Sequence, residues 1–259
     1  MRERESLLSV QAKKWTSNIY RQNHRWSEKN SRKRSMVESK WIHTIHVEKA
    51  GLEIVDKLGW TDKKKELAMM LTYLHDVARP LQAIMTETFS DTSGNFNHSE
   101  IGANMVAIQY PEFPGKSEVV EAIYWHACYK PEIKTDLISF IRDADKYGIL
   151  KHLDFYINNK LFTDYLPRGD ISSEVADAFE MKQPLNYQMI RVKSPADVFV
   201  SRMAWMFDLN FPETQQLFIE NSIPSQMIAL LNQYQTNSNN LDRIVATMSE
   251  WQHEVVTTT

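Results

Sequence analysis

The amino-acid sequence predicts an all-α protein. Apolar residues recur at helical spacing along most of its 259 residues. No alternation of apolar and polar residues with a period of two persists long enough to support a sheet. The seven glycines are at least eight positions apart, which excludes the glycine-rich loops of dinucleotide-binding and P-loop proteins.

Charge divides the chain unevenly. Residues 1–40 hold 11 Lys/Arg and 4 Asp/Glu, a charge of +7, and the rest of the chain carries −10. A nucleic-acid-binding tail is one interpretation of this segment. We favour the other, a basic amphipathic helix folded onto an acidic body, and therefore predict a basic helical arm over residues 1–35. No apolar run is long enough for a signal peptide or a transmembrane span, and the single cysteine suits a reducing cytoplasm.

The central domain begins with a helix predicted over 36–58 and ended by Gly59. Its inward stripe consists of Val47, Ala50, Ile54 and Leu58. The next helix starts at Thr61-Asp62, and its segment 67–74 is apolar on all sides, which predicts a central position. We expect Pro80 to end that helix soon after residue 76.

Polar and proline-rich breaks divide the remainder of the chain. Residues 90–97 form the clearest loop. Further helices are predicted over 98–110, 117–128 and 134–148. Beyond residue 150 the pattern stays helical, with breaks near Pro167, Pro184, Pro195, Pro212 and Pro224. These patterns predict a core domain over 36–160 and a C-terminal helical subdomain over 161–259 packed on it.

Ionisable residues fall on the apolar faces of several predicted helices. The histidines concerned are His43, His75, His98 and His126. Asp76 directly follows His75, and Asp145 shares a face with two isoleucines. Burying so many ionisable groups without partners is costly, and the usual compensation is mutual pairing or a metal ion. Neighbouring side chains diverge on a helix, so His75 can reach one metal while the Asp76 carboxylate bridges two.

The order of these residues resembles a known family. His43, His75-Asp76 and Asp145 reproduce the H…HD…D pattern of the HD-domain metal-dependent phosphohydrolases, and His98 and His126 match members that hold two metals. The segments that resemble a bacterial branch described as HD phosphodiesterases are Leu74–Gln82, Asn97–Gly102, Ile141–Lys146, Ser194–Asp197 and Trp205–Phe211. The likeness covers residues 36–235, and His46 stands where the family usually has arginine.

The resemblance implies a dinuclear site. Its first metal would be held by His43, His75, Asp76 and Asp145, and its second by Asp76, His98 and His126. Imidazole and carboxylate ligands suit Mn²⁺, Fe²⁺, Ni²⁺, Mg²⁺ or Zn²⁺. Two such ions can activate a water for attack on a phosphoryl group, so Asp76 is a catalytic residue in this interpretation.

Cations near the predicted ligands are candidates for binding phosphate. Arg79 and Lys146 are predicted to bind substrate and to act in catalysis, and Lys130 to bind substrate. Pairing with surface carboxylates or exposure to solvent is the alternative for each. Glu100 is a candidate for orienting a ligand histidine, with a surface position as the alternative.

We therefore predict a metal-dependent phosphohydrolase acting on a phosphomonoester or phosphodiester. The expected partner is a small phosphorylated substrate, a nucleotide, with no membrane and no nucleic acid, and the sequence is compatible with a homo-oligomer. One alternative is an HD-fold mixed-valent di-iron oxygenase, which uses the same ligands. Another is a non-catalytic nucleotide-binding HD protein, although no ligand of the pattern is missing.

Overall fold

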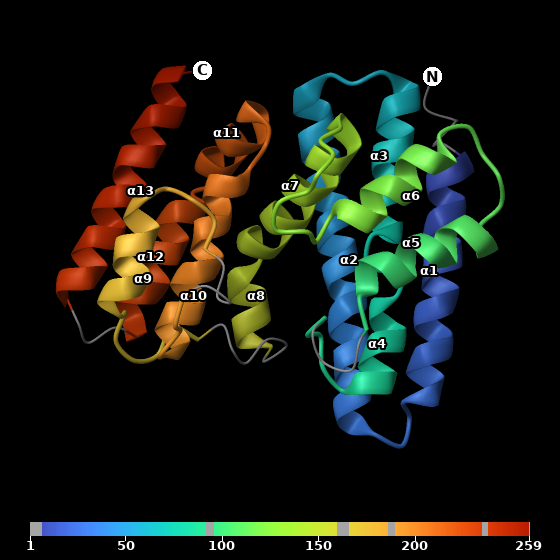
Figure 1. Cartoon of the computed structure of the whole chain (residues 1–259), viewed down its shortest axis with the longest axis horizontal. Coiled ribbons are helices and arrows are strands. Elements are labelled where there is room, and N and C mark those ends of the chain that lie inside the picture. The colour runs from blue at the N-terminus through green and yellow to red at the C-terminus, as the bar shows by residue number, and fades with distance from the viewer. Residues whose placement is uncertain (1–6, 92–95, 160–165, 186–189, 235–237, 259) are drawn as a thin grey trace. The chain divides into compact units, whose positions relative to one another are not determined.

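The structure is a computed structural model that describes residues 7–91, 96–159, 166–185, 190–234 and 238–258. The described residues contain helices and no strand, which confirms the all-α prediction (Figure 1). The chain divides into two compact units, residues 1–148 and 149–259. None of the described helices is long and apolar enough to cross a membrane.

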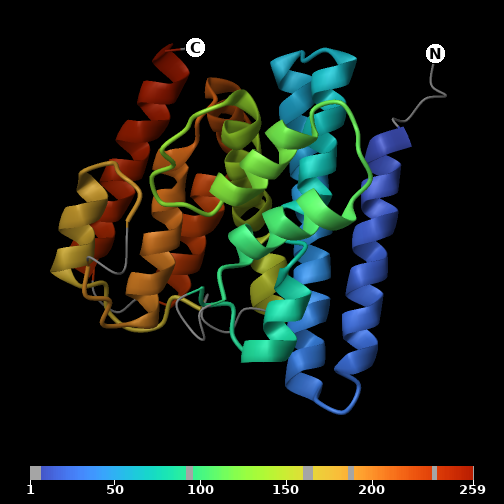
Figure 2. The ribbon, with the colours of Figure 1, turned by 45° about the vertical axis from the view of Figure 1, so that its right-hand side comes forward.

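The first unit is built from the helices that precede Ile149 (Figures 1 and 2). They are α1 (Leu7–Trp26), α2 (Ser31–Leu58), α3 (Asp62–Leu74), α4 (Arg79–Thr86), α5 (His98–Gln109), α6 (Lys116–Trp125) and most of α7 (Asp136–Lys151). Helix α6 ends before the predicted 128, so that His126 lies at its C-terminal cap.

Helix α2 is longer than the sequence pattern suggested. It begins at Ser31 rather than at 36, because the Asn30 side chain accepts a hydrogen bond from the backbone N–H of Lys33 and so caps the first turn. It ends as predicted at Gly59, whose φ of 60° is the left-handed conformation that glycine adopts without strain. Val47, Ala50 and Ile54 are buried along its inner face.

Helix α3 is the centre of the unit, and its segment 67–74 is buried throughout. The prediction that Pro80 closes this helix was wrong. Helix α3 ends at Leu74, a turn follows, and Pro80 lies in the first turn of α4, where a proline loses no hydrogen bond. The break leaves His75 and Asp76 at the end of α3 rather than inside a longer helix.

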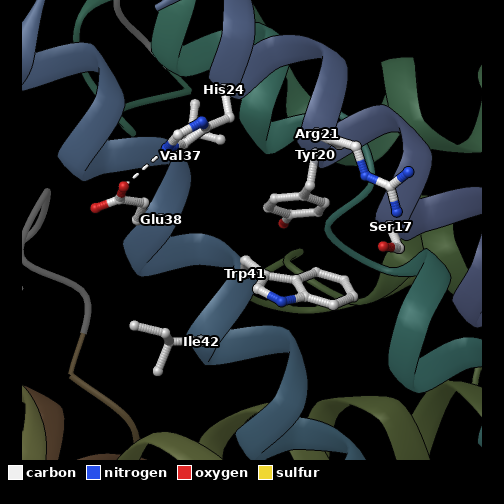
Figure 3. Close-up of a pocket in the computed structure, with 8 residues that line it drawn as sticks. All are labelled: Ser17, Tyr20, Arg21, His24, Val37, Glu38, Trp41 and Ile42. Atoms are coloured by element: carbon white, nitrogen blue, oxygen red, sulfur yellow. Dashed lines mark hydrogen bonds and ion pairs between the residues drawn. The ribbon is translucent and has the colours of Figure 1, made fainter. Parts of the chain in front are cut away.

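Helix α1 packs on α2 and α3. Thr16 Oγ1 donates a hydrogen bond to the Tyr73 carbonyl at 3.2 Å. Tyr20 lies over Trp41 of α2, with ring centroids 5.2 Å apart, beside a hollow of about 420 Å³ between the two helices (Figure 3).

The second unit is also helical. Its elements are α8 (Leu153–Asn158), α9 (Ser173–Glu180), α10 (Pro195–Met203), a 3₁₀ helix η2 (Ala204–Asp208), α11 (Pro212–Glu220), α12 (Ile223–Tyr234) and α13 (Ser238–Thr258). Asp197 is buried and accepts hydrogen bonds from the backbone N–H groups of Ser172 and Lys193 at 2.7 and 2.8 Å. It therefore holds the residue before α9 beside the start of α10.

Two glycines near the predicted site differ in how closely other helices approach them. A Cβ on Gly148 of α7 would lie 3.3 Å from three backbone atoms of His46 and Val47 in α2. A Cβ on Gly102 of α5 would meet only side chains, none nearer than 3.5 Å, which is ordinary contact. The close approach of helices therefore requires glycine at 148 and does not require it at 102.

We predict that Gly148→Ala lowers the free energy of unfolding by about 1–3 kcal/mol, because backbone atoms of α2 would have to move. The matched variant Gly102→Ala should be neutral or stabilising by up to about 1 kcal/mol, because alanine favours a helix. Urea unfolding followed by circular dichroism measures both. Equal effects in the two variants would contradict the close approach of α7 to α2.

Candidate metal centre

The predicted ligands meet inside the first unit, although they come from five elements. His43 lies on α2, and His75 and Asp76 directly follow α3. His98 begins α5, His126 caps the C-terminus of α6, and Asp145 lies on α7. Five of the six residues are buried, namely His43, His75, Asp76, His98 and His126, and the Asp145 side chain is 27% exposed. Among these six side chains, Asp145 is therefore the one most open to solvent.

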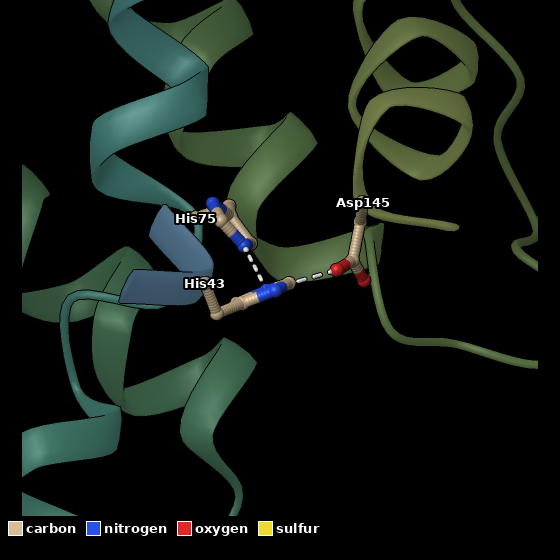
Figure 4. Close-up of side chains that lie close together, drawn as sticks. All are labelled: His43, His75 and Asp145. Atoms are coloured by element: carbon tan, nitrogen blue, oxygen red, sulfur yellow. Dashed lines mark hydrogen bonds and ion pairs between the residues drawn. The ribbon is translucent and has the colours of Figure 1, made fainter. Parts of the chain in front are cut away.

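The first group of potential ligands contains His43, His75 and Asp145. His43 lies between the other two (Figure 4). Its Nε2 is 3.4 Å from His75 Nε2 and 3.0 Å from Asp145 Oδ1. Three ligand atoms therefore converge from α2, the end of α3 and α7.

The second group contains Asp76, His98 and His126. The Nε2 atoms of His98 and His126 are 3.2 Å apart, and they lie 3.3 and 3.7 Å from Asp76 Oδ1. The other oxygen of Asp76, Oδ2, lies 3.5 Å from His43 Nε2. The Asp76 carboxylate thus presents one oxygen to each group, which is the arrangement of a bridging ligand.

These spacings fit metal coordination. A cation about 2.1 Å from each ligand atom separates neighbouring ligand atoms by about 3.0 Å in an octahedron and about 3.4 Å in a tetrahedron. The closest ligand pairs of the two groups lie 3.0 to 3.4 Å apart. Both groups therefore have the dimensions of a coordination shell, and their nitrogen and oxygen donors suit a divalent ion.

The hydrogen bonds of the imidazoles direct lone pairs into the site. Nδ1 of His75 donates to the Thr72 carbonyl at 3.1 Å, and Nδ1 of His126 donates to the Ile123 carbonyl at 2.7 Å. Each ring then carries its proton on Nδ1 and an unshared pair on Nε2. Burial lowers the pKa of His75 to about 4, so this ring is neutral at pH 7. Lone pairs that converge on one point repel one another unless a cation lies between them.

Asp76 remains ionised despite its burial. Burial alone would raise its pKa, but the positive charges of Lys40 and Arg79 outweigh that effect and hold the pKa well below its usual range. Lys40 Nζ donates to Oδ2 at 2.9 Å, and Arg79 Nε donates to Oδ1 at 3.3 Å. Sequence reasoning did not identify Lys40. The available signal was its position three residues before His43, which places both on one face of α2.

Asp91 is the second residue that the sequence did not reveal. Its two carboxylate oxygens lie 2.7 and 2.8 Å from Nδ1 of His98. Burial opposes its ionisation, but the hydrogen bond from His98 and the nearby Arg79 lower the pKa of Asp91 to about 2. Glu100, our candidate for this orienting role, is exposed, so the structure gives that role to Asp91 instead.

The predicted phosphate-binding cations occupy three different settings. Arg79 is within the site, because its Nη1 also donates to Gln82 Oε1, the Phe89 carbonyl and Asp91 at 2.6, 2.8 and 3.4 Å. Lys146 is half-buried on α7 beside Asp145. Lys130 is exposed in the segment after α6, with Nζ 5.8 Å from the centre of the Tyr129 ring. Of these three, Arg79 is the one whose described hydrogen bonds include a potential metal ligand, Asp76.

The fold and the site together define a helical domain with a buried His/Asp metal centre. The family model of the HD domain matches residues 41–150, a segment that contains all six ligands. This match supports, for residues 41–150, the resemblance to the HD-domain metal-dependent phosphohydrolases. No curated protein and no solved structure matches the chain. The likeness to a particular bacterial branch stays a prediction.

We predict that Lys40→Met destabilises the metal-free protein, because a buried ion pair with Asp76 is broken, at a cost of about 3–5 kcal/mol. Mn²⁺ should then restore more stability to the variant than to the wild type, because the cation replaces the lost ammonium charge beside the carboxylate. Thermal unfolding in chelator and in Mn²⁺ measures both effects.

The control for this experiment is Lys49→Met, which removes an exposed lysine from the same helix. It should leave both unfolding temperatures near those of the wild type. If Lys49→Met and Lys40→Met lower the unfolding temperature equally in chelator, Lys40 does not stabilise Asp76.

We predict that Asp91→Asn weakens binding at one of two metal sites about 10- to 100-fold, because His98 loses the carboxylate that orients it. Glu100→Gln, a matched change on the first turn of α5, should leave metal binding unaltered. Isothermal titration of the metal-free protein with Mn²⁺ separates the two. A loss in Glu100→Gln as large as that in Asp91→Asn would show that the orienting carboxylate is misassigned.

Proposed function

We propose that this chain is a metal-dependent phosphohydrolase that cleaves a phosphomonoester or a phosphodiester, with a nucleotide as its substrate class. One observation carries the proposal: two groups of three potential ligands share the carboxylate of Asp76 within an HD domain. Divalent cations held by such groups supply an activated water and neutralise charge on a phosphoryl oxygen. The choice of a nucleotide rests on the family resemblance.

The residues of the chain divide the work in this proposal. Asp76 holds the two ligand groups together, and Lys40 fixes that carboxylate through the hydrogen bond to Oδ2. Asp145, the half-open member, lies where a substrate can approach. The neutral imidazole of His75 provides its lone pair at physiological pH without first losing a proton.

Cations beside the centre provide the phosphate contacts of the proposal. The guanidinium of Arg79 is held at Asp76 and suits bidentate binding of a phosphate. Lys146 follows Asp145 directly in α7, and Lys130 stands four residues beyond His126 on the exposed connection to α7. Arg79 is half-buried and Lys130 is exposed, whereas the ammonium nitrogen of Lys146 is buried, so Arg79 and Lys130 are the more accessible cations for a phosphorylated substrate.

We predict that His75→Ala and Asp76→Asn each abolish metal-dependent hydrolysis of bis-p-nitrophenyl phosphate and p-nitrophenyl phosphate. Each variant should also bind fewer equivalents of Mn²⁺, because it removes a ligand from one or both groups. Activity assays and elemental analysis of the purified protein measure these losses. His253→Ala, a change at an exposed histidine of α13, should alter neither activity nor metal content.

Two results would contradict hydrolysis. Full activity in Asp76→Asn would show that turnover does not depend on the shared carboxylate. A mixed-valent di-iron signal in electron paramagnetic resonance, perturbed by an organic substrate, would instead support the HD-fold oxygenase alternative, since iron would occupy the same ligands.

A further inference from the structure

The connection between α1 and α2 forms a projecting surface, which we call the basic tip and define as residues 21–34. In both ribbon views it extends beyond α4 and the other helices of the first unit (Figures 1 and 2). It lies outside the matched HD segment and takes no part in the metal centre. An inference about it is therefore independent of the proposed phosphohydrolase activity.

Trp26, the last residue of α1, is unusual among the seven tryptophans of the chain. It is 70% exposed, whereas the other six are buried or half-buried. Most of those pack on aromatic neighbours, as Trp15 does on Tyr110 and Trp41 on Tyr20. Trp26 instead presents a large apolar ring and a polar N–H to the solvent at the end of a projection.

Uncompensated positive charge surrounds this ring. Residues 21–34 hold six Lys/Arg and one acid, Glu28. The acids that face the tip from neighbouring segments are already engaged: Glu38 pairs with His24 and Arg34, and Glu87 pairs with Lys33 (Figure 3 shows the first pair). Among the described residues, no ion pair involves the exposed side chains of Arg21, Arg25, Lys29 and Arg32.

The backbone of the basic tip is fixed by local hydrogen bonds. Ser27 Oγ donates to the His24 carbonyl at 2.7 Å, and the Asn30 N–H donates to the Ser27 carbonyl at 2.9 Å. Asn30 then caps α2. The backbone that carries the ring and the cations is consequently ordered, so a partner need not order the segment when it binds.

We propose that the basic tip binds the anionic surface of a lipid membrane. Its cations would attract acidic headgroups, and Trp26 would insert at headgroup depth, the position that tryptophan prefers at membrane interfaces. A single ring at the end of a convex projection suits a flat surface. Sites for single-stranded nucleic acid instead use grooves in which several aromatic rings stack on successive bases.

This attachment is peripheral. The sequence led us to expect no membrane partner, and this proposal departs from that expectation without invoking a membrane-spanning helix, of which the described residues contain none. A helix end that lies on a membrane needs only charge and interfacial aromatic area.

Vesicle co-sedimentation of the full chain tests the proposal. We expect binding to vesicles of phosphatidylcholine with about one third phosphatidylglycerol, falling with added salt, and at least about tenfold weaker binding to phosphatidylcholine alone. Arg25→Glu/Lys29→Glu should weaken binding to the acidic vesicles at least about tenfold, and Trp26→Ala should weaken it several-fold.

The matched control is Lys49→Glu/Lys63→Glu, which makes the same change in net charge at exposed lysines of α2 and α3 away from the tip. It should retain most of the binding, and unfolding temperatures check that all variants are folded. The proposal is overturned if acidic vesicles do not bind, if both lipid mixtures bind equally, or if the control loses as much as the tip variant. Tighter binding to single-stranded RNA than to acidic vesicles would also overturn it.

Discussion

The buried carboxylate of Asp76 is the constraint on which the arrangement of the first unit depends. An unpaired carboxylate in such a position costs several kcal/mol. Here Lys40 of α2 and Arg79 of α4 donate to it, and the imidazoles of α5 and α6 lie against one of its oxygens. Both cations also flank the ring of Phe89, 5.3 and 5.7 Å from its centre. Four helices must therefore keep their positions for one charge to remain compensated.

The backbone supports this cluster at two points. Helix α3 ends at Leu74, so His75 and Asp76 lie at a helix terminus, and the turn that follows brings the Arg79 side chain back to the carboxylate. Gly148 lets α7 approach the backbone of α2, which sets the distance between Asp145 and His43. A side chain at 148 would separate the two helices that supply the first ligand group. Packing and coordination are thus fixed by the same contacts.

The sequence predicted well those features that depend on a single local segment. Periodicity predicted the helices, and the order of histidines and aspartates predicted residues that the structure brings together. The sequence did not predict Lys40 or Asp91, because their roles depend on contacts with residues elsewhere in the chain. Lys40 contacts Asp76, 36 positions away, and Asp91 contacts His98, 7 positions away. Glu100 looked as suitable as Asp91, yet the cap formed by Asn97 starts α5 so that Glu100 faces solvent. Asn30, a residue type that commonly caps helices, indicated that α2 begins at Ser31. The prediction started at residue 36 instead, because the apolar stripe begins later in the helix.

Positive charge has two distinct uses in the first unit. At the metal centre, buried Lys40 and half-buried Arg79 both pair with the carboxylate of Asp76, and these pairs hold α2 and α4 beside it. The arm attaches to the body mainly through Thr16, Tyr20 and Trp15, with Lys13–Glu48 as an ion pair at the rim. Lys33 and Arg34 form ion pairs, but among the described residues the cations of Arg21, Arg25, Lys29 and Arg32 do not. A +7 segment can therefore fold onto the domain and still present its charge to an outside partner.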